Sequence, residues 1–129
     1  MYTIGTAANL SGVNIETIRY YEREGVVPKA DRSSSGRRIY DKDQITRLRF
    51  VKRCRDLGFP IPEVKSLLAL TQGTPTSCSE AREIGKTHLL TVKQRIADLE
   101  RMEHALSDMV ELCGTGKREC PMLRQLFAD

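Results

Sequence analysis

The stretch TIGTAANLSGVNIETIRYYEREGVV, residues 3–27, decides the expected fold, because it predicts two short helices around a tight turn. Gly12 interrupts the first helical pattern, and Asn14 can cap the second helix by accepting a hydrogen bond from a free backbone N–H. Gly25 then ends the second helix. The apolar faces are assigned to Ile4, Ala7, Ala8 and Leu10 in the first helix and to Ile15 and Ile18 in the second. A helix–turn–helix at about residues 3–24 is therefore expected.

The next segments extend this small head. KADRSSSGRRIY, residues 29–40, contains a polar turn followed by a β-prone run, and predicts a hairpin or wing at about residues 32–40. DKDQITRLRFVKRCRDLGF, residues 41–59, predicts a helix that Asp41 can cap. PIPEVKSLLAL, residues 60–70, predicts a further short helix. A mainly α winged helix–turn–helix is the simplest account of these patterns.

Such a fold would lay its second helix in the major groove of DNA. Arg19 is the strongest candidate for contact, because a guanidinium offers two donors to guanine or phosphate. The full set of candidate DNA-binding residues is Thr17, Arg19 and Tyr20 on the helix and Arg37, Arg38 and Tyr40 on the wing. Tyr21 and Tyr40 could instead pack inside the small head, and Arg23 and Arg55 are interpreted as solvated surface.

The charge of the chain is unevenly distributed. The net charge is +4, and residues 1–58 hold 12 of the 21 Lys and Arg but only 7 of the 17 Asp and Glu. The surplus of positive charge in the first half is typical of a nucleic-acid-binding head on a neutral remainder. An ordinary solvated basic surface would give the same count, so charge leaves both interpretations open.

A long helix is predicted from about residue 79 to about residue 112, a region without proline. Its apolar residues recur at steps of three and four, with one step of seven across Glu103, which is the heptad seam of a coiled coil: Leu89, Val92, Ile96, Leu99, Leu106, Val110 and Cys113. The narrow seam with charged flanks favours pairing with a second copy of the chain, and the alternative is a long helix lying on its own domain.

The motifs TIRYYEREG (residues 17–25), GRRIY (residues 36–40) and LRFVKRCRDLGFPIPEVKSLL (residues 48–68) resemble the MerR family of bacterial transcription regulators. The resemblance extends through the long helix and the cysteine-bearing tail. It implies a DNA-binding domain over residues 1–75, followed over residues 76–129 by an antiparallel dimerisation helix and a metal-binding loop. It also implies a homodimer on promoter DNA that bends and untwists the duplex when effector binds, so that RNA polymerase can engage both promoter elements.

The cysteines of the tail are the candidate effector site. Cys78 and Cys113 are 35 positions apart, or about 50 Å along one helix, so they cannot share a metal within one chain. In the antiparallel dimer that the resemblance implies, Cys78 of one subunit meets Cys113 and Cys120 of its partner. MerR-like metal sensors use these three positions. Cys54, within a basic helix, is interpreted as a buried packing residue.

Three thiolates favour soft or borderline metal ions. They exclude Mg(II) and Ca(II), which prefer oxygen ligands. Hg(II) is the first candidate, with Cd(II), Pb(II) and Zn(II) next, because His88 and His104 lie mid-helix and offer zinc no evident fourth ligand. Copper-sensing members of the resembled family are expected to carry serine at the position of Cys78. A copper(I)-responsive or redox-responsive regulator of the same fold is the alternative, and a disulfide between Cys113 and Cys120 is also conceivable.

Other classes of protein fit the sequence less well. No base–nucleophile pair or phosphate-binding loop is visible, so an enzyme is not expected. Aromatic residues make up only 5% of the chain and Trp is absent, which disfavours a large aromatic effector cavity. No run approaches the roughly 18 apolar residues of a membrane span, and MYTIGTAANL is unlike a signal peptide. A cytoplasmic protein without membrane association is therefore expected.

Overall fold

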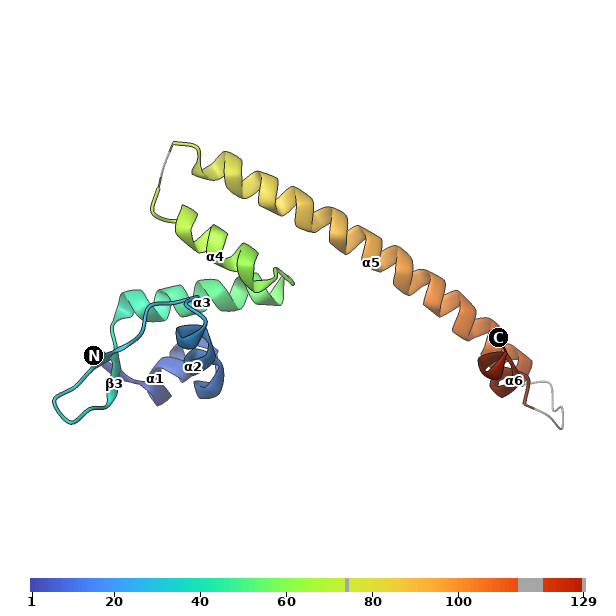
Figure 1. Cartoon of the computed structure of the whole chain (residues 1–129), viewed down its shortest axis with the longest axis horizontal. Coiled ribbons are helices and arrows are strands. Elements are labelled where there is room, and N and C mark those ends of the chain that lie inside the picture. Colours follow the sequence, from blue (N-terminus) through green and yellow to red (C-terminus); the bar gives the residue numbers. More distant parts are fainter. Residues whose placement is uncertain (74, 114–119, 129) are drawn as a thin grey trace. The chain divides into compact units, whose positions relative to one another are not determined.

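The computed structural model describes residues 1–73, 75–113 and 120–128, and of Cys113, Pro121 and Met122 it describes only the backbone. The chain forms two compact units, residues 1–85 and 86–129, and each is considered by itself. Figure 1 shows the elements in chain order. They are β1 (Tyr2–Thr3), α1 (Ile4–Ser11), α2 (Ile15–Arg23), β2 (Asp31–Arg32), β3 (Arg38–Tyr40), α3 (Lys42–Asp56), α4 (Ile61–Leu70), α5 (Ser77–Cys113) and α6 (Pro121–Phe127).

The helix–turn–helix forms as its turn residues predict. Gly12 adopts a left-handed backbone with φ of 76°, and its N–H donates to Ala8 O at 2.9 Å to end α1. Asn14 Oδ1 accepts from Thr17 N at 2.8 Å and caps α2. Ala7 and Ile18 are fully buried, whereas Leu10 is 43% exposed. The assignment of Leu10 to the buried face is wrong, because Leu10 lies in the last turn of α1, at the edge of the core.

The predicted wing is the hairpin of β2 and β3, in which Asp31 pairs with Ile39 and Arg32 with Arg38. The structure adds a third strand that the sequence pattern does not predict. β1 pairs antiparallel with β3, with Tyr2 opposite Tyr40, so β3 is the central strand of the sheet. The wing is thereby joined through β1 directly to the start of α1.

The core of the first unit lies where the helices α1 to α4 meet the sheet. Ile18, Leu48, Val51 and Val64 are its largest fully buried side chains. Asp41 and Gln44 form a reciprocal capping box that begins α3, with Gln44 N donating to Asp41 Oδ1 at 2.8 Å. Cys54 is buried among these helices, as expected, and burial raises the pKa of its thiol.

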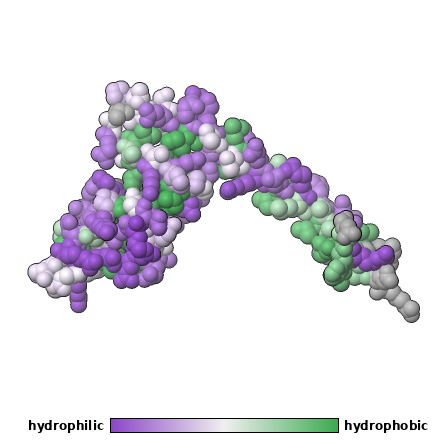
Figure 2. Space-filling model, in the orientation of Figure 1, coloured by the Kyte–Doolittle hydropathy of each residue, from purple (hydrophilic) through white to green (hydrophobic). Residues whose placement is uncertain are grey.

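α5 is a single helix of 37 residues. Several large apolar side chains along it are more than half exposed in the single chain: Leu89, Leu90, Ile96, Leu99, Met102, Leu106 and Val110. Figure 2 shows hydrophobic surface along α5 towards its C-terminal end. Within the part of the chain that the structure describes, no helix is long and apolar enough to cross a membrane.

Candidate nucleic-acid interface and metal-binding cysteines

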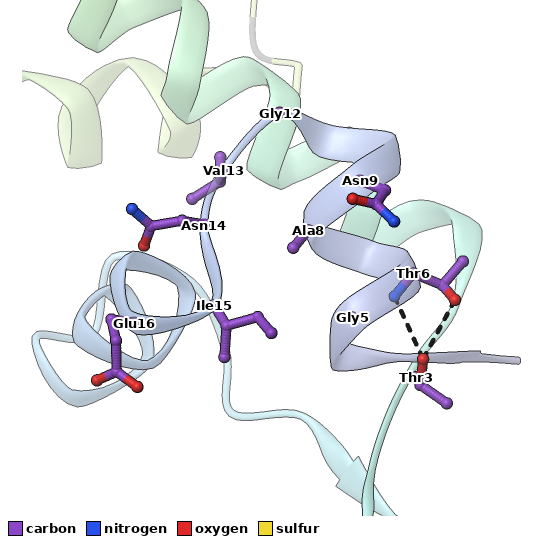
Figure 3. Close-up of a pocket in the computed structure, with 10 residues that line it drawn as sticks. All are labelled: Thr3, Gly5, Thr6, Ala8, Asn9, Gly12, Val13, Asn14, Ile15 and Glu16. Atoms are coloured by element: carbon purple, nitrogen blue, oxygen red, sulfur yellow. Dashed lines mark hydrogen bonds between the residues drawn. The ribbon is translucent and has the colours of Figure 1, made fainter.

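α2 presents a polar face because its apolar face is used by the core. Ile18, Tyr21 and Glu22 are buried, whereas Tyr20 is 42% exposed and Thr17 and Arg19 are half-buried. An open groove of about 870 Å³ separates α1 from the start of α2, and Figure 3 shows its ten lining residues. Thr3 Oγ1 at one end of the groove accepts from Thr6 N at 3.2 Å and caps α1. The groove therefore exposes the beginning of α2, where a DNA-reading helix makes its contacts.

Four arginines line a second cleft, of about 330 Å³, where α2 faces the wing. Its walls are Thr3, Ile4, Arg19, Arg32, Arg37 and Arg38. Arg32 Nη1 donates to Gly36 O at 2.9 Å and thereby holds the hairpin turn. Arg19 Nη1 forms an ion pair with Glu16 Oε1 at 2.7 Å, while Arg19 Nε is buried and has no hydrogen-bond partner within the described residues. This arginine cleft concentrates positive charge, which suits a phosphate group.

Glu22 joins the arginine cleft to the rest of the head. Its carboxylate is buried and accepts from Tyr40 Oη at 2.9 Å and from Ala30 N at 3.1 Å through Oε1. Its Oε2 lies 3.2 Å from Arg38 Nε. The carboxylate thus ties α2 to the loop before β2 and to two residues of β3. We call Glu22, Ala30, Arg38 and Tyr40 the Glu22 network.

The Glu22 network changes the interpretation of Tyr40. Only 2% of Tyr40 is exposed, so its side chain cannot contact a phosphate in this conformation, and its assignment to the DNA-binding surface is corrected to packing within the head. Burial, followed by the hydrogen bond to Glu22 and its negative charge, raises the pKa of Tyr40 well above the usual range. Arg38 is half-buried against Glu22, and Arg37 is exposed. Glu22 and Arg32 were not predicted as site residues. The role of Glu22 depends on a contact between α2 and β3 that no local pattern encodes, and Arg32 acts within the hairpin turn.

The candidate metal ligands occupy the two ends of α5 and the segment after it. Cys78 is exposed in the first turn of α5, Cys113 is its last residue, and Cys120 is half-buried immediately before α6. The side chain of Cys113 and residues 114–119 lie outside the described residues. Among the residues that the structure describes, no three His, Cys, Asp or Glu come together within one chain to hold a metal. His88 is buried in α5 and His104 is exposed.

Comparison with known proteins decides the family. Residues 2–71 match the model of the MerR HTH family regulatory protein, and residues 45–109 match the model of the MerR DNA-binding region. The chain belongs to the MerR family. This MerR-family chain is therefore a transcription regulator and not an enzyme.

The relatives of this MerR-family regulator include proteins named for mercury resistance. The chain is 40% identical over 129 residues to the mercuric resistance operon regulatory protein of Serratia marcescens, covering 98% of this chain and 88% of the relative. It is 36% identical to the protein of the same name from Bacillus cereus, covering 98% of this chain and 97% of the relative.

Two solved structures are similar over nearly the whole chain. One is the transcription regulator PbrR691 of Ralstonia metallidurans in complex with lead(II), with a TM-score of 0.81, 31% identity and coverage of 98% of this chain and 99% of that one. The other is MerR of Bacillus megaterium in complex with mercury(II), with a TM-score of 0.74, 32% identity and coverage of 98% and 100%. The winged helix–turn–helix followed by a long helix is thus confirmed as the fold of this chain.

Proposed function

We propose that this MerR-family regulator binds promoter DNA as a homodimer and activates heavy-metal resistance genes when a thiophilic divalent ion binds its cysteines. Residues 1–75 would act as the DNA-binding domain, and residues 76–129 would supply the dimerisation helix and the metal-binding loop and tail. RNA polymerase would be the partner at the same promoter, because the distorted duplex would let it engage both promoter elements. A cytoplasmic location follows from this role.

The arginine cleft is the observation that carries DNA binding. A phosphate placed between α2 and the wing would meet the guanidinium groups of Arg19, Arg37 and Arg38. Phosphate contacts of this kind fix the register of a protein on the duplex without reading its sequence. Thr17 and Tyr20, on the accessible side of α2, would then face base edges or the sugar–phosphate backbone.

The cysteines support the metal-responsive part of the proposal. Cys78 is an exposed thiol at the start of α5, and Cys113 ends the same helix. At about 1.5 Å per residue the two are about 50 Å apart, so only a second chain running antiparallel could bring Cys78 beside Cys113 and Cys120. Thiolate sulfur is a ligand that soft metal ions prefer. Each of the two equivalent sites would then contain residues from both subunits.

Mercury(II) is the favoured ion. The mercuric resistance regulators among the relatives and the mercury(II) complex of a neighbour support it. The lead(II) complex of another neighbour supports Pb(II) as a further candidate ion. Cd(II) and Zn(II) are the remaining candidates. Because such a site spans the dimer interface, occupancy would bias the relative placement of the two DNA-binding heads. Bending a promoter costs on the order of 1–6 kcal/mol, which contacts with phosphate must offset.

Mixed dimers test the shared metal site sharply. The variants Cys78→Ser and Cys120→Ser should each fail to give thiolate-to-metal charge-transfer absorption with Hg(II) as homodimers. A co-expressed mixed dimer should recover one intact site per dimer, because Cys78 of one subunit meets the intact Cys113 and Cys120 of the other. Absorption by either homodimer variant equal to that of the parent, or none in the mixed dimer, would refute the shared site.

Gel-shift titration on the palindromic promoter tests the DNA half independently of metal. Arg19→Ala should weaken binding about tenfold or more, because it removes a charge-assisted phosphate contact worth roughly 1.5–3 kcal/mol. Arg101→Ala, on exposed α5, is the matched control and should leave the affinity unchanged. Equal affinity of Arg19→Ala and the parent would remove the arginine cleft from the interface.

A further inference from the structure

A third cleft in the first unit has a composition that neither DNA nor metal binding explains. It has a volume of about 590 Å³ and lies between the end of α2, the loop before β2, α3 and α4. Its lining shares two properties, an apolar floor and a cationic rim. The floor consists of Val26, Val27, Pro28, Leu68 and Ala69, and the rim of Arg23, Lys29, Arg47 and Lys65.

The rim cations are largely unused by the protein. Arg47 Nε pairs with Asp43 Oδ2 at 3.1 Å. Arg23, Lys29 and Lys65 are exposed and form no ion pair with any residue that the structure describes. Glu22 is the one carboxylate in the lining, and its oxygens are engaged by the Glu22 network. The cleft therefore presents excess positive charge to an incoming group.

One wall of the cleft is a helical stripe. Leu68, Ala69 and Gln72 lie three, four and seven positions after Lys65, so the four residues share one face of α4 and the turn after it. The opposite wall is the loop from Gly25 to Lys29, in which Val26 and Val27 are buried. A groove with a charged rim over an apolar floor matches the way that protein surfaces receive an amphipathic peptide.

We propose that this cleft is a docking site for an acidic peptide segment of a protein that meets the regulator at the promoter. Carboxylates of the segment would pair with Lys29, Lys65 and Arg23, and its apolar side chains would lie on Leu68 and Ala69. Charge complementarity favours an acidic occupant, and the floor favours a peptide over a DNA phosphate, because phosphate gains nothing from apolar surface. Its lining shares no residue with the arginine cleft and includes none of the cysteines.

Fluorescence anisotropy on the full-length dimer tests the proposal with two labelled peptides of equal negative charge. The first interleaves acidic residues with leucine, and the second replaces each leucine by serine. The leucine peptide should bind, and the serine peptide should bind at least about tenfold more weakly because it cannot use the floor. Equal binding of the two peptides would show bulk charge attraction alone and would overturn the proposal.

Two variants locate the binding. Lys65→Glu reverses a rim charge, and Ala69→Glu places a carboxylate on the floor. Each variant should bind the leucine peptide about tenfold or more weakly than the parent does, while its promoter affinity and dimer mass stay unchanged. Lys42→Glu, exposed at the start of α3 and outside the cleft, is the control of equal charge change. If the same variants also lose promoter affinity, the cleft binds DNA. If they change the mass of the dimer, the cleft contacts a second copy of the chain. Either result would overturn the proposal.

Discussion

Glu22 is the residue on which the geometry of the arginine cleft depends. Replacing it with glutamine removes the negative charge beside Arg38 Nε while keeping the size of the side chain. We expect Glu22→Gln to destabilise the protein by about 1–2 kcal/mol, because the carboxylate is buried and accepts three contacts. We also expect promoter affinity to fall about tenfold, because the ion pair with Glu22 no longer holds Arg38 in the arginine cleft.

The control for Glu22→Gln is Glu24→Gln, which removes the same charge from an exposed position after α2. Chemical denaturation and gel-shift titration on both variants separate a general loss of charge from the loss of the Glu22 network. Equal promoter affinity for Glu22→Gln and Glu24→Gln would contradict a positioning role for Glu22.

Tyr40 gives the head a dependence on alkaline pH. Its pKa is raised in the folded state, chiefly by burial, relative to a usual value of 10.0. The stability from its protonated hydroxyl is therefore complete below about pH 10 and is lost as pH rises above that value, because the unfolded chain ionises first. One proton corresponds to a slope of about −1.4 kcal/mol per pH unit in the free energy of unfolding.

The variant Tyr40→Phe should reduce the free energy of unfolding at neutral pH by about 1 kcal/mol, because the hydrogen bond to Glu22 is lost. The difference between the two proteins should narrow above about pH 10. Urea denaturation at pH values from 7 to 11 measures this difference, in which the contribution of Cys54 and of the other tyrosines cancels. A difference that stays constant with pH would show that Tyr40 titrates normally.

Some site residues could be assigned from the neighbouring sequence alone, and others depend on contacts between distant segments. Arg19 is placed on the outer face of its helix by helical periodicity, and Arg37 is placed outside by the turn signal at Gly36. Tyr40 and Glu22 could not be assigned in the same way, because their fate depends on a contact between residues 18 positions apart. A tyrosine in a short strand is equally compatible with an exposed or a buried face until the neighbouring element is known.

At the scale of elements, the turn chemistry made the helices predictable. Gly12, Gly25 and Gly58 all adopt positive φ at helix ends, where an L side chain would be strained, and Asn14 and Asp41 cap the helices that follow. β1 escaped prediction because a strand of two residues has no alternation to recognise. It forms because Tyr2 and Thr3 find partners in β3, which is a long-range event.

The capping box of α3 offers a test at this scale. Asp41→Ala removes the acceptor for Gln44 N and should lower the free energy of unfolding by about 1 kcal/mol, since the first turn of α3 then loses its cap. Asp41→Asn is the matched control, because an amide oxygen can still accept this hydrogen bond, and it should cost much less. Thermal denaturation compares the two. Equal losses would mean that charge at the helix terminus matters more than the cap.

For the whole molecule, the apolar seam of α5 requires a partner surface that covers it. Leu99 is 61% exposed and Ile96 is 51% exposed in the single chain, which is unusual for large apolar side chains in regular register. The heptad spacing was readable from sequence because it is a local periodic signal. The identity and direction of the covering helix are not local properties, so an antiparallel copy of α5 remains a prediction.

The variant Leu99→Lys tests this prediction by placing a charge in the seam. We expect the dimer to dissociate, with a shift to the monomer mass in sedimentation equilibrium, because a buried unpaired ammonium between two helices costs several kcal/mol. Loss of the dimer should abolish both promoter binding and the shared Hg(II) absorption. Leu90→Lys is the matched control, since Leu90 is 62% exposed but lies outside the heptad seam. A dimer that survives Leu99→Lys but not Leu90→Lys would place the interface on another face of α5.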